Sequence, residues 1–173
     1  MKFIRLLSKD DKMFNDAMIL YKKSFPCHEQ RGMESQIEIL NDKEYHFDLI
    51  YDNNSFVGII LYWETLNYIY IEHFCIEPNM RNKKYGENAL ELLKKRKKTI
   101  ILEIDPPIDE ISIRRKLFYT RAGYKENDFN HIHPPYSKYN KGHLLSVMSY
   151  PDFLTQIEYD NFNLYLENRV MKV

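Results

Sequence analysis

The densest group of chemically capable residues follows a run of β-branched and aromatic residues near the middle of the chain. Arg81, Lys83 and Lys84 stand in the turn after this run, just before a helical pattern. The first backbone N–H groups of a helix have no partner within the helix, and the helix dipole is positive there. We therefore predict that the amides of residues 82–87 and the adjacent cations bind an anion such as a phosphate or pyrophosphate.

Two histidines form a second group. The run His131-Ile132-His133 would place both imidazoles on one face of a strand, because side chains alternate along a strand. No third ligand stands near this pair in the sequence, so we predict that no metal is bound. The cysteines, Cys27 and Cys75, form no Cys-x-x-Cys pair, which predicts free thiols.

The elements that must position these groups are strands and helices in alternation. Runs of β-branched and aromatic residues predict strands, and apolar residues at helical spacing predict helices. The expected strands are 2–7, 44–51, 55–64, 67–77, 99–104, 124–129 and 144–149, and the expected helices are 11–24, a short one ending near 40, 86–97, 109–122 and 151–170. We predict an α+β (or α/β-like) fold with a mixed sheet, whose second to fourth strands form an antiparallel meander.

Three features of the helices follow from the pattern. The helix over 109–122 should end in a left-handed residue at Gly123. The basic run at 94–98 should be a solvated helix end, where cations suit the dipole. The last helix should pack one apolar stripe, formed by Phe153, Ile157, Phe162, Tyr165 and Leu166.

Length and composition restrict the class of protein. The chain has 173 residues, of which 44% are hydrophobic, which predicts one domain with its own core. No apolar run approaches the roughly 18 residues that cross a bilayer, and the charged N-terminus lacks a signal-peptide pattern, so a cytoplasmic protein without membrane contact is expected. Lys+Arg and Asp+Glu are both 25, and this balance argues against nucleic-acid binding.

The basic turn resembles the acyl-CoA loop of the GCN5-related N-acetyltransferase (GNAT) family, whose pattern is R/Q-x-x-G-x-G/A after a strand. Gly86 matches the second glycine, whereas Lys84 replaces the first glycine and Glu87 replaces the small final residue. Lys84 suits cofactor binding if its φ is negative, and a positive φ predicts a loss of affinity. The residues of the resembling segment that would bind the cofactor are Arg81, Asn82, Lys83, Lys84, Tyr85, Gly86 and Glu87.

Other segments share this resemblance. RRKLFYTRAGY at 114–124 is similar to the late helix of the family, with Tyr119 and Gly123 on its pattern. SFPCHEQR near the start, EIDPP after the fifth strand and HIHPPYSKYNKGHLLSVMSYP near the end look like a bacterial branch with FPxxExR, PP and PPY segments. The resemblance spans roughly residues 3–151.

The resemblance implies a fold and a cofactor. It implies a single GNAT domain over 1–173, with a mostly antiparallel sheet splayed between its fourth and fifth strands, flanking helices, and a C-terminal helical extension at 151–173. Acetyl-CoA would be the acyl donor and an amine the acceptor. The pantetheine arm would bond to the backbone of the fourth strand at Phe74, Cys75 and Ile76.

Tyr119 is the predicted acid that protonates the CoA thiolate. A phenol with a reference pKa near 10 stays protonated at neutral pH, and a thiolate with a reference pKa near 8.5 accepts its proton. Helical spacing places Ser112 and Arg115 on the same face as Tyr119, where the resemblance implies contact with the cofactor.

Three residues are candidates for the general base, besides a water chain with no dedicated base. Glu72 lies mid-strand, and His73 should point to the opposite side unless a β-bulge intervenes. Glu103 lies on the fifth strand, at the position where the chain resembles ribosomal-protein acetyltransferases that carry a base. Burial in an apolar strand should raise the pKa of either carboxylate, which suits proton abstraction.

The acceptor site is predicted from the segment between the first two helices. Glu29 and Arg31 would meet an ammonium and a carboxylate, and Tyr136 would cover them. The acceptor is a small amine or a peptide, and the protein a monomer or homodimer. Two alternatives are a non-catalytic acyl-CoA-binding module, which Lys84 and Glu87 favour, and a phosphate-ligand-binding protein of unrelated α/β fold.

Overall fold

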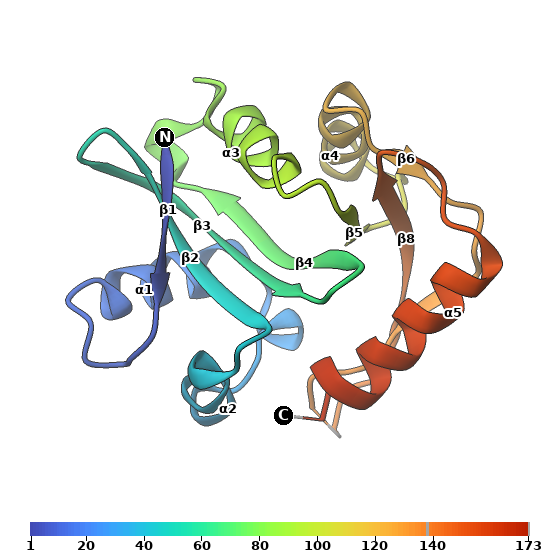
Figure 1. Ribbon diagram of the computed structural model, residues 1–173, viewed down its shortest axis with the longest axis horizontal. Helices are drawn as coiled ribbons and strands as arrows, with labels where there is room; N and C mark the ends of the chain where they lie inside the picture. The colour runs from blue at the N-terminus through green and yellow to red at the C-terminus, as the bar shows by residue number, and fades with distance from the viewer. Residues whose placement is uncertain (138, 173) are drawn as a thin grey trace. The chain divides into compact units, whose positions relative to one another are not determined.

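The computed structural model describes residues 1–137 and 139–172 (Figure 1). The chain divides into two compact units, Met1–Lys98 and Thr99–Val173. Each unit contains both helices and antiparallel strands, so the predicted α+β class is confirmed.

The first unit builds a sheet with helices between and after its strands. Its elements are β1 (Lys2–Leu6), α1 (Phe14–Ser24), the 3-10 turn η1 (Cys27–Glu29), α2 (Met33–Glu38), the 3-10 turn η2 (Ile39–Asn41), β2 (Tyr45–Asp52), β3 (Ser55–Glu64), β4 (Tyr68–Ile76), the 3-10 turn η3 (Pro78–Met80) and α3 (Tyr85–Lys94). The strands pair antiparallel in the order β1-β2-β3-β4. This order confirms the predicted meander of β2, β3 and β4.

The core of this unit follows the apolar patterns. Every residue of β3 from Val57 to Trp63 is buried, as expected for a strand covered on both faces. The helix α1 packs on β3, and the buried side chains Phe14, Ala17, Met18, Leu20 and Tyr21 form its inner face. Phe14, Ala17, Met18 and Tyr21 lie on one side of α1, since residues three and four apart share a helix face.

A β-bulge interrupts the pairing of β3 with β4. Leu61 pairs with His73 and Tyr62 pairs with Ile71, which leaves Glu72 as the extra residue. A bulge breaks the alternation of side chains along a strand. Glu72 and His73 consequently both contact the segment that follows α1, which is the outcome that the sequence analysis allowed for if a bulge intervened.

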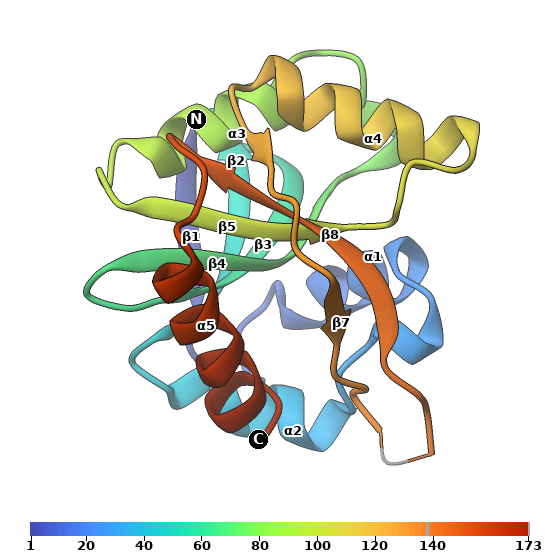
Figure 2. The ribbon, with the colours of Figure 1, turned by 90° about the vertical axis from the view of Figure 1, so that its right-hand side faces the viewer.

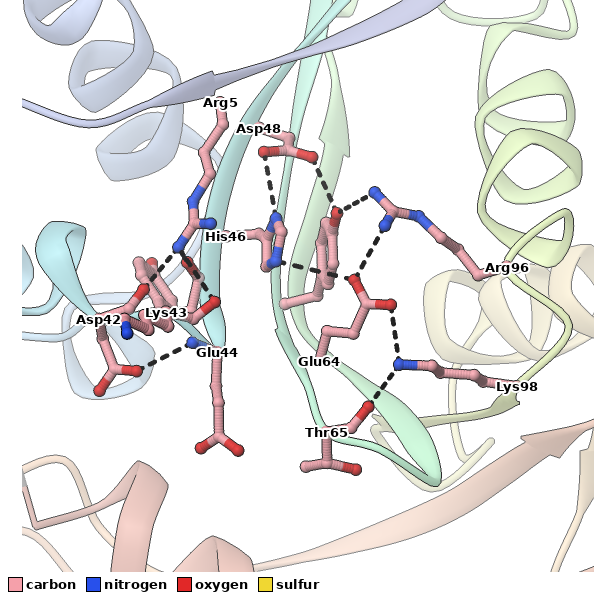
Figure 3. A network of polar contacts seen from close by, with 12 residues as sticks. Arg5, Asp42, Lys43, Glu44, His46, Asp48, Glu64, Thr65, Arg96 and Lys98 are labelled. Carbon is pink, nitrogen blue, oxygen red and sulfur yellow. Dashed lines mark hydrogen bonds and ion pairs between the residues drawn. The ribbon is translucent and has the colours of Figure 1, made fainter.

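A polar network joins β2, β3 and the segment after α3 (Figure 3). The ring of His46 lies between two carboxylates, with Nδ1 3.8 Å from Asp48 Oδ1 and Nε2 3.7 Å from Glu64 Oε2. Glu64 also binds Arg96 at 3.2 Å and Lys98 at 3.0 Å. Part of the basic run at 94–98 therefore anchors the segment after α3 to β3, although Lys95, Arg96 and Lys97 are exposed, as expected of a solvated helix end.

The second unit is organised around one long strand (Figure 2). Its elements are β5 (Thr99–Ile104), α4 (Glu110–Arg121), β6 (Lys125–Glu126), β7 (His131–His133), β8 (His143–Tyr150), α5 (Gln156–Tyr165) and the π-helical turn η4 (Leu166–Val170). β8 pairs antiparallel with β5, β6 and β7. The alternation in β7 buries His131 and His133 and exposes Ile132, so both imidazoles share one face, as predicted.

The ends of α4 follow the rules of helix capping. Asp109 caps the N-terminus, and its carboxylate accepts hydrogen bonds from the N–H groups of Ile111 and Ser112 at 2.9 and 2.8 Å. After the last turn, Gly123 has a φ of 85°. The predicted left-handed end at Gly123 is thus confirmed.

The C-terminal helix is present, but its buried stripe differs from the prediction. Phe162, Leu166 and Val170 are buried, whereas Phe153 and Ile157 are 62% and 73% exposed. The helix begins only at Gln156, so Phe153 precedes it. Ile157 lies five residues before Phe162, which places it about 140° around the helix from the buried stripe. Among the described residues, no helix has the length and apolarity needed to cross a membrane.

Candidate active site

The start of α3 offers the predicted anion-binding amides. β4 ends at Ile76, and a short 3-10 turn leads to the loop before the helix. Within the described part of the chain, no side chain caps the N-terminus of α3, whose N-cap residue is Lys84. Unpaired amides at a helix N-terminus, next to basic side chains, favour an anion. The local geometry therefore has the form expected of a pyrophosphate site.

Two residues of this loop have left-handed backbone conformations. Asn82 and Lys84 both have a φ of 62°. Asparagine tolerates this region, whereas a lysine in it is strained because its Cβ crowds the backbone. The positive φ of Lys84 is the case for which the sequence predicts a loss of cofactor affinity.

A side-chain hydrogen bond ties the loop to the end of β4, and β3 lies close to the same end. Arg81 Nε donates to the carbonyl oxygen of Ile76 at 3.2 Å. On β3, a Cβ added at Gly58 would lie 2.4 Å from the carbonyl oxygen of Cys75. Sequence analysis missed Gly58, although a glycine inside an apolar strand is a signal of close backbone approach. Gly58 allows β3 to approach the segment proposed to hold the pantetheine.

Cys75 is not suited to covalent catalysis. Burial raises the pKa of its thiol to about 11, because desolvation disfavours the thiolate. The nucleophilic form is therefore scarce at neutral pH. Cys75 and Cys27 are both free cysteines, as predicted.

Glu72 is held in a buried ion pair. Its Oε1 lies 2.8 Å from Arg31 Nη2, and its Oε2 accepts a hydrogen bond from Trp63 Nε1 at 2.8 Å. Burial disfavours the carboxylate, but the Arg31 charge and the hydrogen bonds outweigh it and hold the pKa of Glu72 below its ordinary value. The expected raised pKa is thus wrong for Glu72, because the sequence did not show Arg31 and Trp63 as its partners.

His73 is fixed beside this pair. Its Nε2 donates to the carbonyl oxygen of Glu29 at 2.8 Å, and its ring packs edge-on against Tyr21 and Phe25. Arg31 N also donates to Tyr21 Oη at 2.9 Å. The structure therefore brings the predicted acceptor residues Glu29 and Arg31 together with two of the predicted bases, Glu72 and His73.

Glu103 lies in a different cluster, within the second unit. Its side chain is 5% exposed, and its Oε1 forms a hydrogen bond with Nε2 of His131. Its Oε2 lies 3.7 Å from Nε2 of His133. His131 Nδ1 in turn lies 3.0 Å from Tyr159 Oη on α5. Sequence analysis missed Tyr159, and only the pairing of Glu103 with a histidine could have suggested a further partner.

The remaining predicted residues of this unit lie on α4 and in the loop before β8. Tyr119 is buried and packs against Phe118 and Tyr124 at ring distances of 5.0 and 5.7 Å. The hydroxyl of Ser112 is engaged in the capping box with Asp109, and Arg115 pairs with Asp105. The ring of Tyr136 lies 5.2 Å from that of His133.

Comparison with known proteins identifies the family. The sequence profile of the acetyltransferase (GNAT) family matches residues 13–124. This chain belongs to the GNAT family. It is accordingly an acyltransferase, and its reaction is acyl-CoA-dependent acetyl transfer. A search of curated proteins finds no significant match.

Solved structures give the same fold for this GNAT protein. A protein from Bacteroides thetaiotaomicron assigned to the GNAT family is 28% identical, with a TM-score of 0.93 over 100% of this chain and 99% of that chain. The ribosomal-protein-S18-alanine N-acetyltransferase from Escherichia coli is 16% identical, with a TM-score of 0.59 over 89% and 95% of the two chains. A Bacillus subtilis acetyltransferase in complex with CoA is 13% identical, with a TM-score of 0.56 over 86% and 97%.

The last two similarities concern the fold alone. The family match confirms the resemblance to the GNAT family. Among the described residues, no group of three or more His, Cys, Asp or Glu side chains could hold a metal ion.

Proposed function

We propose that this GNAT protein transfers the acetyl group of acetyl-CoA to an amine by direct attack. The observation that carries the proposal is the uncapped N-terminus of α3, directly after β4 in a chain of this family. The amides of residues 82–87 and the side chains of Arg81 and Lys83 bind the pyrophosphate. The end of β4, at Phe74, Cys75 and Ile76, holds the pantetheine arm.

The chemical steps need one acid and one base. The amine nitrogen attacks the thioester carbon, the C–S bond breaks, and Tyr119 protonates the departing thiolate. The acceptor ammonium first loses one proton to Glu103, and the second proton that its nitrogen loses as the amide forms restores the phenol of Tyr119. Glu103 is favoured over Glu72 because the neighbours of Glu103 are the imidazoles of His131 and His133, whereas the guanidinium of Arg31, which is always charged, holds Glu72 as an anion.

The acceptor remains an amine of a small molecule or peptide. We propose that Glu29 attracts its ammonium group, since this carboxylate is partly exposed. Arg31 is engaged by Glu72 and shapes the site by holding the segment after α1 against β4. Tyr136 contributes to the acceptor wall. Replacing Glu29 with Gln should raise the KM for a cationic acceptor and leave the KM for acetyl-CoA unchanged, and equal acceptor kinetics in both proteins would contradict this role.

The test of the reaction is CoA release with a panel of amines. The wild-type protein should release thiol only when an acceptor is present. Tyr119→Phe should lower turnover by roughly 10²-fold or more, with nearly unchanged CoA binding measured by calorimetry. CoA binding without acceptor-dependent thiol release would instead favour the non-catalytic acyl-CoA-binding module. Wild-type turnover in Tyr119→Phe would remove this residue from the mechanism.

A further inference from the structure

The C-terminal helix contributes a side chain to the cluster around Glu103. Tyr159 Oη, on α5, lies 3.0 Å from His131 Nδ1, and His131 Nε2 pairs with Glu103 Oε1. All three residues belong to the second unit, where they lie on β5, β7 and α5. The side chains of Glu103 and His131 are 5% and 0% exposed. A continuous line of polar contacts thus runs from the helix to a buried carboxylate.

The order of donors along this line is set by the carboxylate. An ionised Glu103 only accepts hydrogen bonds, so His131 donates to it through Nε2. In the neutral imidazole, Nδ1 is then an acceptor, and the hydroxyl of Tyr159 is its donor. The Tyr159 hydroxyl therefore favours the tautomer of His131 that presents an N–H group to Glu103.

The hydroxyl of Tyr159 is held in place and stays protonated. Its ring stacks on Phe129 with centroids 4.0 Å apart and planes 11° apart. Burial, together with the charges of Glu103, Asp160 and Glu167, raises the pKa of Tyr159. The phenol is thus a donor throughout the neutral range.

Other ionisable groups also face the cluster. His133 lies on the same strand as His131, with Nε2 3.7 Å from Glu103 Oε2. The ring of His143, on β8, lies 5.7 Å from that of His133. The carboxylates of Asp160 and Glu167 act on Tyr159 from its own helical segment. Because these ionisable groups lie around Glu103, the test compares the pH profiles of variants with one another rather than the absolute pKa value from one profile.

We propose that His131 and Tyr159 are positioning residues for Glu103, so that the C-terminal helix is part of the catalytic apparatus of acetyl transfer. This inference rests on the proposed role of Glu103 as the base. His131 fixes the direction of the carboxylate and favours its charged form, and Tyr159 fixes the tautomer of His131. Neither residue needs to touch the substrate.

The first experiment replaces Tyr159 with Phe. This change keeps the ring that stacks on Phe129 and removes only the hydroxyl. Loss of one hydrogen bond should lower kcat/KM for the amine by roughly two- to twelve-fold, with unchanged calorimetric affinity for CoA. The matched control is Ile157→Ala on the same helix, whose side chain is 73% exposed and which should behave as wild type.

The second experiment separates orientation from a purely structural role. His131→Gln keeps an N–H donor for Glu103, whereas His131→Leu removes it. With Leu, the acid limb of the kcat/KM profile should move to higher pH, because the carboxylate loses a donor that favours its charged form. With Gln, the limb should stay near its wild-type position and much of the activity should return. If His131→Leu does not fold, the Gln and Tyr159→Phe variants still decide the question.

The outcomes distinguish this inference from the proposed function. If the wild-type protein transfers acetyl groups to no amine, the proposed function fails. If Glu103→Gln keeps wild-type turnover, Glu103 is not the base, and the inference fails with it. If Glu103→Gln is impaired while Tyr159→Phe matches Ile157→Ala in rate and pH profile, only the positioning role is overturned.

Discussion

Replacing Glu72 with Gln asks whether this carboxylate stabilises the fold or accepts a proton. The side chains of Arg31 and Glu72 are 3% and 1% exposed, so the change leaves a buried guanidinium without its counter-charge. The new amide group would also face Arg31 or Trp63, both of which are donors. Breaking one partner of a buried ion pair costs about 3–5 kcal/mol. We expect the free energy of unfolding to fall by about this amount.

Urea denaturation at neutral pH measures the effect, and a double variant provides the control. Removing both charges in Arg31→Met with Glu72→Leu should recover most of the loss, because buried pairs can be replaced by apolar groups at little cost. The pH dependence has a definite sign. The lowered pKa of Glu72 means that its contribution is present above the unfolded-state pKa of about 4.3 and is lost as pH falls through the folded-state pKa.

The result that would refute this reasoning is specific. If Glu72→Gln unfolds at the same urea concentration as the wild type but loses the acid limb of its pH–rate profile, Glu72 is the general base. The ion pair with Arg31 would then be a resting contact that the substrate replaces.

Three further predictions concern the loop before α3 and the strands β3 and β4. Lys84→Gly should stabilise the protein by up to about 1 kcal/mol, because relief of the left-handed strain exceeds the added entropy of the unfolded chain. The control Lys83→Gly should destabilise the protein. Equal midpoints of urea unfolding for the two variants would contradict this prediction. Gly58→Ala should cost about 1–3 kcal/mol through its clash with the backbone of β4, whereas Gly32→Ala, which has open space around its Cβ, should be nearly neutral by thermal unfolding. Cys75→Ala should retain CoA release, since the thiol pKa is raised to about 11, and a covalent acyl-enzyme would be indicated by its loss.

Much of the fold was predictable because its signals are local. Runs of β-branched and aromatic residues predicted β2, β3 and β4, and a single glycine predicted the end of α4. The loop before α3 was equally predictable, since its basic residues and the helix that follows them are adjacent in the sequence. The left-handed φ of Lys84 was not predicted, because a lysine normally has a negative φ. The expected cofactor affinity was therefore made to depend on the sign of this angle.

The catalytic assignments were harder to predict because they depend on contacts between residues that are far apart in the sequence. Arg31 is 41 positions from Glu72, and Tyr159 is 28 positions from His131. The bulge at Glu72 carries no sequence signal, yet it decides that this residue faces Arg31. Similarly, the burial of the last helix depends on where the helix begins and on which of its faces packs. Phe153 was wrongly expected to pack because it precedes the helix, and Ile157 because it lies on a face that does not pack.

The extra residue at Glu72 also sets the phase of everything after it on β4. Beyond a bulge, each side chain points to the face opposite to the one that unbroken alternation would give. In a homologue that lacks this residue, the side chains of Phe74, Cys75 and Ile76 would point to the opposite faces of the strand, although the residue types would be the same. A sequence alignment would then match these residues of β4, although the homologue would turn the opposite face of the strand toward the ligand.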